Sequence, residues 1–313
     1  MDSRAKNNFF DAILFGDVEL VRSMLNSHDG ILKERLYGQT SLMIAIIGNK
    51  LNVASILLLK SDEGAQNKGV ETTLARLAKD YLDIVKILLP KSDVNAQDSN
   101  KKTTIMYAIE NDSYEIVKML LDSGADVKVC ENGKTTLQYA FNRGNLEMVK
   151  LLLDSSVDPN TSSVLATICA FDYLEIVRLL LKYGADPNKQ CSEGKSPLSV
   201  ACSAGKIGTV RLLLEQKSID VNIVDQRRMT PLMDACRRGR LQVAEHLVSL
   251  PHVNVGLRNC NNETAIFYAI RTKNLDLVKA VLGRVKPTES DRQTACEYGT
   301  AVICREITLL LRA

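Results

Sequence analysis

The sequence predicts an all-α protein, a solenoid of stacked helix-turn-helix units joined by short hairpin loops. Three features that recur along the chain predict it. Each unit opens with Thr or Ser followed by apolar residues at helical spacing, as in Thr230-Pro231-Leu232 and Ala235. A glycine such as Gly239 ends this short helix, and a second helix, here 241–248, carries Leu and Val along one side. Helices of about ten residues are marginal alone in water, so neighbouring units must stabilise them.

The unit recurs at a spacing of roughly 33 residues, which is typical of repeat proteins. The opening unit carries its two helices at 9–14 and 18–25. The later units open at Thr40, Thr72, Thr103, Thr135, Ser163, Ser196, Thr230 and Thr264. Turns of the type Gly124-Ala125-Asp126 follow the second helices.

This pattern strongly resembles the ankyrin repeat, whose hallmarks are a Thr-Pro-Leu-His-x-Ala opening, a second helix ending in Leu-Leu and a Gly-Ala-Asp-x-Asn turn. The resemblance covers essentially the whole chain, with about nine to ten repeats. The histidine of the opening motif is absent throughout. It is replaced by Met43, Met106, Gln138, Ser199, Met233 and Phe267. Because that histidine joins adjacent loops in the family, we expect looser hydrogen bonding between the loops.

We expect residues 1–313 to form a single ankyrin-repeat domain. Residues 1–36 form its N-terminal capping repeat, 37–290 its central repeats and 291–313 its C-terminal cap. The array is irregular near 154–173, because Ser163 follows Thr135 too closely to leave room for a complete hairpin. We therefore expect earlier hydrogen exchange in 154–173 than in the regular run 196–282.

Composition favours a folded protein without a membrane anchor. Hydrophobic residues make up 45% and charged residues 25% of the chain, and the net charge is +3. No apolar run approaches the length of a membrane span, and the N-terminus lacks the apolar core of a secretion signal. We expect a cytoplasmic monomer.

The cysteines fit a packing role better than a metal or disulfide role. Cys169, Cys202 and Cys236 occupy the same position in three repeats, next to a small apolar residue. No Cys-x-x-Cys pair occurs, and none of the three histidines has a convincing ligand spacing. We expect no metal, no cofactor and no disulfide needed for stability.

Catalytic motifs are missing as well. The sequence contains no phosphate-binding glycine loop, nucleophile elbow or zinc-protease motif, so we expect no enzyme and no catalytic residues. Recurring aspartates follow the second helices at Asp93, Asp126, Asp158, Asp186 and Asp220. Their fixed place in the repeat favours hydrogen bonds that form turns over a carboxylate cluster. Glu115, Glu147 and Glu175 are expected to solvate the outer helices.

The resemblance implies instead a binding surface, since ankyrin repeats bind partners in a concave groove formed by hairpin loops and first helices. Carried over position by position, the candidate groove residues are Tyr37, Lys102, Lys134, Asn142, Arg143, Arg227, Arg228, Arg237, Arg238, Arg271 and Lys273. We expect a non-catalytic scaffold that holds a partner protein or peptide there.

Charge indicates the chemistry of this partner. Residues 223–313 hold 14 basic and 9 acidic side chains, so the surplus of positive charge lies in the last repeats. Arginine suits bidentate contacts with carboxylates or phosphates, which favours an acidic or phosphorylated partner. The alternative is a nucleic-acid or phosphate-binding module that uses this Arg-rich surface. Nucleic acid is less favoured, because interleaved aromatic residues and a strongly basic overall charge are missing.

Arg237 and Arg238 follow the apolar residues Ala235 and Cys236, so both side chains are expected to point away from the core. Reversing both charges to Glu is therefore expected to abolish partner capture and leave the fold intact.

Overall fold

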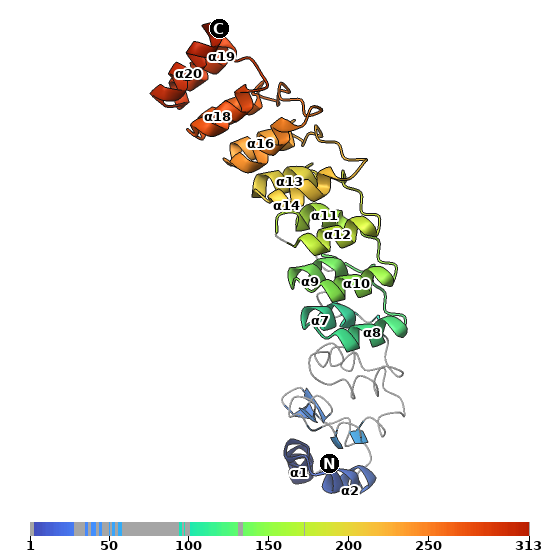
Figure 1. Ribbon diagram of the computed structural model, residues 1–313. Coiled ribbons are helices and arrows are strands. Elements are labelled where there is room, and N and C mark those ends of the chain that lie inside the picture. Colours follow the sequence, from blue (N-terminus) through green and yellow to red (C-terminus); the bar gives the residue numbers. More distant parts are fainter. Residues whose placement is uncertain are drawn as a thin grey trace. The chain divides into compact units, whose positions relative to one another are not determined.

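The structure is a computed structural model that describes residues 3–27, 35–36, 39–41, 44–45, 50, 52–53, 56–57, 94–95, 97, 101–130, 134–171 and 173–312. It divides the chain into two compact units, Met1–Val157 and Asp158–Ala313. The α-helices that the structure describes in each unit form short pairs (Figure 1). The expected single domain stays a prediction.

The first unit opens with a helix pair. Its elements are α1 (Ser3–Phe15), α2 (Val18–Ser27), β1 (Arg35–Leu36), β2 (Gln39–Thr40), α7 (Thr104–Glu110), α8 (Tyr114–Asp122), α9 (Thr136–Asn142) and α10 (Leu146–Asp154). Helix α1 begins earlier than the sequence pattern indicated and buries Phe9, Phe10 and Ile13. Strands β1 and β2 form a short antiparallel hairpin, with Arg35 opposite Thr40. The third predicted repeat, near Thr72, lies outside the described residues.

The second unit continues the same pattern. Its elements are the 3-10 helix η3 (Thr161–Ser163) and the α-helices α11 (Val164–Ile168), α12 (Leu174–Lys182), α13 (Pro197–Ala204), α14 (Ile207–Leu214), α15 (Pro231–Arg237), α16 (Leu241–Ser249), α17 (Ala265–Arg271), α18 (Leu275–Leu282), α19 (Glu289–Tyr298) and α20 (Ala301–Arg312). Within this unit the loops that join successive pairs lie on one side of the helices (Figure 1). The first helices α13, α15 and α17 pack against one another in that order.

In three repeats the side chain of the opening residue, Thr135, Ser196 or Thr230, caps the first helix. The hydroxyl of Thr230 accepts a hydrogen bond from the backbone N–H of Met233 at 3.2 Å, and Pro231 occupies the first turn. Ser196 caps α13 through Ser199 in the same way. These caps satisfy backbone donors that have no partner inside the helix.

Side chains in the turns after the second helices connect neighbouring repeats. The Asn188 carboxamide accepts the N–H of Asp220 at 2.8 Å and donates to the carbonyl of Ser218 at 2.7 Å. The same pair of bonds recurs at Asn95, Asn160 and Asn222.

The aspartates that follow the second helices act within their own turns. In each case the carboxylate accepts the backbone N–H two residues further along the chain, at Asp126, Asp158, Asp186 and Asp220. The predicted turn role of these four residues is confirmed. Asp93 lies outside the described residues.

The core is built from the small and branched apolar side chains of both helices. Cys169, Cys202 and Cys236 are fully buried in it, which confirms their predicted packing role. Burial raises the pKa of all three thiols, that of Cys236 to about 12. These cysteines therefore stay protonated and unreactive at neutral pH.

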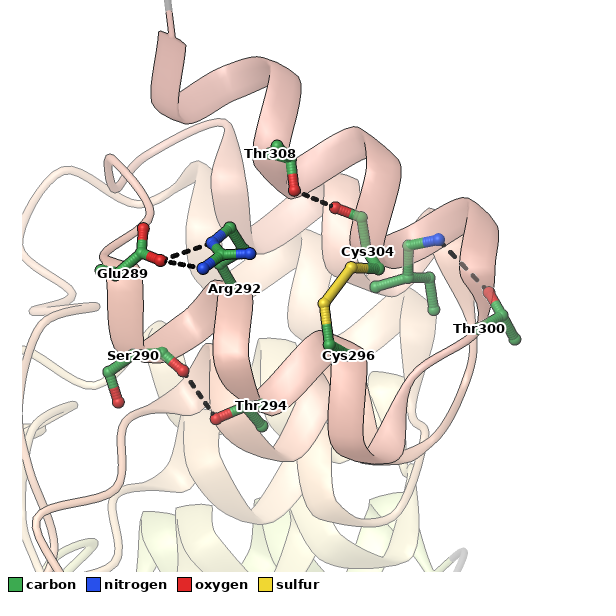
Figure 2. The surroundings of a disulfide bond; sticks show 9 residues. Glu289, Ser290, Arg292, Thr294, Cys296, Thr300, Cys304 and Thr308 are labelled. Carbon is green, nitrogen blue, oxygen red and sulfur yellow. Dashed lines mark hydrogen bonds and ion pairs between the residues drawn. A yellow bond between two sulfur atoms is a disulfide. The ribbon is translucent and has the colours of Figure 1, made fainter.

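The last helix pair holds a disulfide that the sequence analysis did not foresee. Cys296 of α19 and Cys304 of α20 are bonded, with their Cα atoms 5.3 Å apart (Figure 2). The bond forms because the chain reverses between the two helices and brings cysteines eight positions apart together. The expectation that no disulfide is needed for stability stays a prediction. Thr300 accepts the N–H of Ile303 at the start of α20, and Glu289 pairs with Arg292 on α19.

Candidate partner-binding groove

A pocket of about 650 Å³ lies in the second unit, where three successive hairpins meet the first helices α15 and α17. It is lined by Ser192, Glu193, Lys195, Asp225, Gln226, Arg227, Met229, Arg237, Asn259, Cys260, Asn261 and Tyr268. We call this set of residues the groove. Of the residues predicted from the sequence to bind a partner, Arg227 and Arg237 lie in it.

Hydrogen bonds between hairpins hold the groove walls in place. The Gln226 side chain donates to the carbonyl of Ser192 at 2.9 Å, and the N–H of Cys260 donates to the carbonyl of Arg227 at 3.1 Å. Gln190 makes a similar bond to Val224. Glutamine side chains and backbone groups thus connect loops that the absent histidine joins in the family.

Asp225 and Asn259, at the bases of two hairpins, accept hydrogen bonds from backbone N–H groups of the same hairpins. The Asp225 carboxylate accepts the N–H groups of Arg227 and Met229, both at 2.8 Å. The Asn259 carboxamide accepts the N–H groups of Asn261 and Glu263, both at 2.9 Å. Both bonds to Asp225 use the same oxygen, Oδ1, so this carboxylate fixes the hairpin in front of α15.

Tyr268 forms part of the opposite wall. Its hydroxyl donates to the Glu263 carboxylate at 2.6 Å and accepts from Asn259 at 2.8 Å. Burial and the Glu263 carboxylate raise the pKa of Tyr268 to about 12. The ring is therefore a neutral, fixed surface across the physiological range.

Arg237 is anchored by a buried carboxylate. Its guanidinium donates to Oδ1 of Asp234 at 2.8 Å. The Asp234 side chain is completely buried, whereas 35% of the Arg237 side chain is exposed. Burial raises the pKa of Asp234, an effect that Arg237 partly offsets. Arg237→Glu would place a second carboxylate beside Asp234, so the expectation that this change leaves the fold intact does not hold.

Arg271 lies beside the groove and contacts two aromatic rings. The centre of its guanidinium is 5.7 Å from the Phe267 ring and 5.4 Å from the Tyr298 ring. Phe267 also meets the ring of Tyr268 edge-on at 5.4 Å. An aromatic strip therefore leads from the groove wall at Tyr268 to Arg271.

Other predicted positive charges lie elsewhere. Arg238 caps the C-terminus of α15 and is exposed. Arg228 and Lys273 are exposed and have positive φ angles of 59°, so both occupy tight turns. None of these three belongs to the groove-lining residues that the structure describes.

The candidate binding residues in the first unit are not among the residues that line the groove. Lys102 has a side chain only 11% exposed, pairs with Glu110 at 2.6 Å and lies over the Tyr107 ring. Lys134, Asn142 and Arg143 are exposed. Tyr37 lies outside the described residues.

Sequence reasoning missed Tyr268 in the groove wall, and it missed Asp234, Phe267 and Tyr298, which contact Arg237 and Arg271. The spacing of Asp234 and Arg237 on one helix could have revealed their ion pair. The contact of Tyr298 with Arg271 joins two repeats at positions that do not correspond, so no repeat pattern could have shown it.

Among the described residues, no cluster of His, Cys, Asp and Glu has the geometry to hold a metal ion. No described helix is long and apolar enough to cross a membrane.

Comparisons with known proteins agree with the repeat geometry. The family model for ankyrin repeats matches residues 9–98, 73–163, 164–259 and 219–294. The chain is structurally similar to the human ASB11 ankyrin repeat domain, with a TM-score of 0.59 and 22% identity over 71% of this chain and all of that one.

Sequence relatives match only in part. An 85-residue stretch is 32% identical to alpha-latrotoxin-Lt1a of Latrodectus tredecimguttatus and covers 27% of this chain and 6% of the toxin. A 91-residue stretch is 29% identical to the ankyrin repeat and KH domain-containing protein mask-1 of Caenorhabditis elegans and covers 3% of that protein. This chain thus spans a small fraction of either relative, and the likeness rests on the repeats. Because the repeat model accounts for nearly all of its length, the chain belongs to the ankyrin-repeat family.

Proposed function

We propose that this protein is a non-catalytic scaffold that binds an acidic partner protein or peptide in the groove of its last repeats. Ankyrin repeats are generally protein–protein interaction modules, which supports the general role. The observation that carries the specific role is the convergence of Lys195, Arg227 and Arg237 on one pocket. We place the protein in the cytoplasm, as a monomer.

Charge and shape together support an acidic polypeptide as the occupant. The groove is lined by three basic side chains, Lys195, Arg227 and Arg237, and by two acidic ones, Glu193 and Asp225. Glu193 pairs with Lys195 at 3.9 Å, so Arg227 and the exposed part of Arg237 are the basic groups offered to a ligand. Aromatic and arginine side chains such as Tyr268 and Arg227 are the residue types that contribute most to binding energy at protein interfaces. The partner can carry its negative charge on carboxylates or on phosphorylated side chains.

The test compares two variants as bait. Arg227→Glu with Arg271→Glu reverses two charges at the groove and spares the Asp234 pair. Arg211→Glu with Lys217→Glu makes the same change in charge at exposed positions of α14 and the loop after it. Crosslinking and capture identify partners, and each purified partner is then titrated against wild type and both variants.

The proposal predicts that the groove variant loses affinity about tenfold or more and that the control variant does not. Equal affinity of all three proteins would contradict it. A steep linear fall of log affinity with log salt, with captured nucleic acid in place of protein, would favour a nucleic-acid-binding module instead.

A further inference from the structure

Two arginines occupy the same position on neighbouring first helices. Helices α15 and α17 each have seven residues, follow a threonine N-cap and end at Arg237 and Arg271 respectively. The two helices pack against each other. Both arginines thus stand one repeat apart along the same row of the surface.

Arg237 is held by Asp234 of its own helix, and Arg271 by Phe267 of its own helix and Tyr298 of α19. Asp234 takes one guanidinium nitrogen of Arg237, which leaves the remaining N–H groups of this half-exposed side chain without an acceptor among the described residues. Arg271 rests on the Phe267 and Tyr298 rings, and its N–H groups have no acceptor among those residues either. A guanidinium held in this way loses less conformational entropy when it binds a carboxylate.

The separation of the two helices sets the spacing of a matching ligand. Helices in contact have axes about 8–10 Å apart. An extended polyproline II segment rises about 3.1 Å per residue with three residues per turn, so side chains three positions apart face the same way about 9 Å apart. A β-strand places same-facing side chains about 7 or 13 Å apart, which fits this row less well.

We propose that Arg237 and Arg271 bind two carboxylate side chains three residues apart in an extended segment of the partner. This inference rests on the proposed function and assigns it a ligand pattern. The residues between the two acids lie over the aromatic strip formed by Tyr268 and Phe267. Because Asp234 already neutralises part of the charge of Arg237, singly charged carboxylates match the row better than doubly charged phosphoryl groups.

The experiment measures the affinity of short fluorescein-labelled peptides made of Pro, Ala and Ser. The peptides carry two glutamates spaced two, three or four positions apart, one glutamate, two phosphoserines three apart, or glutamines only. They are titrated against wild type, Arg271→Ala, Arg271→Lys and Arg211→Ala. Arg211 is an exposed residue of α14 and serves as the matched control. Arg237 is left unchanged, because its loss would leave Asp234 buried without its partner.

The three-residue spacing should bind about tenfold more tightly than the other spacings and than the single glutamate. Arg271→Ala should reduce this peptide to the affinity of the single-glutamate peptide. Arg271→Lys should recover little, because an ammonium cannot make the planar bidentate contact. Arg211→Ala should bind like wild type, and thermal melts of all variants should coincide.

Other outcomes separate this inference from the proposed function. If all glutamate pairs bind alike, or Arg271→Ala binds the three-residue pair as wild type does, the spacing is wrong and an acid-binding groove remains. Tighter binding of the phosphoserine pair would overturn the assignment to carboxylates. If no acidic peptide binds more tightly than the glutamine peptide, both this inference and the acidic-partner proposal are wrong.

Discussion

The repeats that begin with α11 and α15 differ in the way their first helices start. Helix α15 has seven residues, a threonine cap and a proline in its first turn. Helix α11 has five residues, and its N-cap residue Ser163 makes no capping bond and has a φ of 52°. The hairpin before α15 forms a wall of the groove, whereas a turn of 3-10 helix precedes α11.

A regular repeat has both a buried core residue on its first helix and a capped helix start preceded by a hairpin, and α11 has only the first of these. Leu165 and Leu232 are almost equally buried, so the shorter helix still contributes to the core. The capping threonine and the hairpin are what α11 lacks. The core positions therefore keep the repeats stacked, and the opening motif with its hairpin forms the wall of the groove.

The largest expected effect comes from truncating the core leucines of α11 and α15, which tests whether both helices contribute equally to the core. Leu232→Ala and Leu165→Ala each remove a buried side chain and should each lower the free energy of unfolding by about 2–5 kcal/mol. Denaturant unfolding followed by circular dichroism measures both. If Leu165→Ala costs less than about 1 kcal/mol, the repeat with α11 does not share the packed core.

The second prediction concerns the disulfide of the last helix pair. Closing a loop of this length removes entropy from the unfolded chain worth about 2–3 kcal/mol. Reductant, or Cys296→Ser with Cys304→Ser, should therefore destabilise α19 and α20, an effect visible as faster hydrogen exchange there. Exchange in α13 should change little, because contacts in repeat arrays are between neighbours. Unchanged exchange in both helices would show that the bond contributes no stability.

The capping position of the two repeats should respond unequally to substitution. Thr230→Ala removes a capping bond and should cost about 1 kcal/mol. Ser163→Ala removes the bond from the Ser163 hydroxyl to the carbonyl of Gln190, and Ser163→Gly removes the same bond but adopts the positive φ without strain. Ser163→Gly should therefore be more stable than Ser163→Ala by up to about 1 kcal/mol. The unfolding free energies of the three variants are compared with that of wild type, and a Ser163→Gly variant less stable than Ser163→Ala would contradict the assigned backbone conformation.

The smallest expected effect is a pH dependence of the free energy of unfolding that arises from Asp234 of α15. Burial raises the folded-state pKa of Asp234 above its ordinary value of 3.8, so the folded protein binds its proton more tightly than the unfolded chain. Stability from this group is therefore greatest below pH 3.8 and is lost as pH rises through the raised pKa. Wild type should lose stability relative to Asp234→Asn over that range. A difference that is flat, or that favours wild type at higher pH, would show that the Arg237 pair outweighs burial.

Repeat patterns predicted the fold well, because a capping residue, a helical spacing and a turn each have local causes. The buried cysteines and the turn aspartates followed from their fixed places in the repeat. The groove was harder to predict, since the residue types at its positions differ from one repeat to the next. Arg227 and Arg237, which the resemblance named, line the groove, but the Asp234 pair, the Tyr298 contact and the Cys296–Cys304 bond depend on tertiary geometry.

Hydrogen exchange of the protein with and without a purified partner tests the central claim most directly. The account predicts slower exchange on binding in residues 224–237 and 258–271, which hold the hairpins and first helices of the groove. Exchange in the second helices α14, α16 and α18 should stay the same. Protection confined to those second helices would contradict the account, because the partner would then bind the outer face and leave the groove empty.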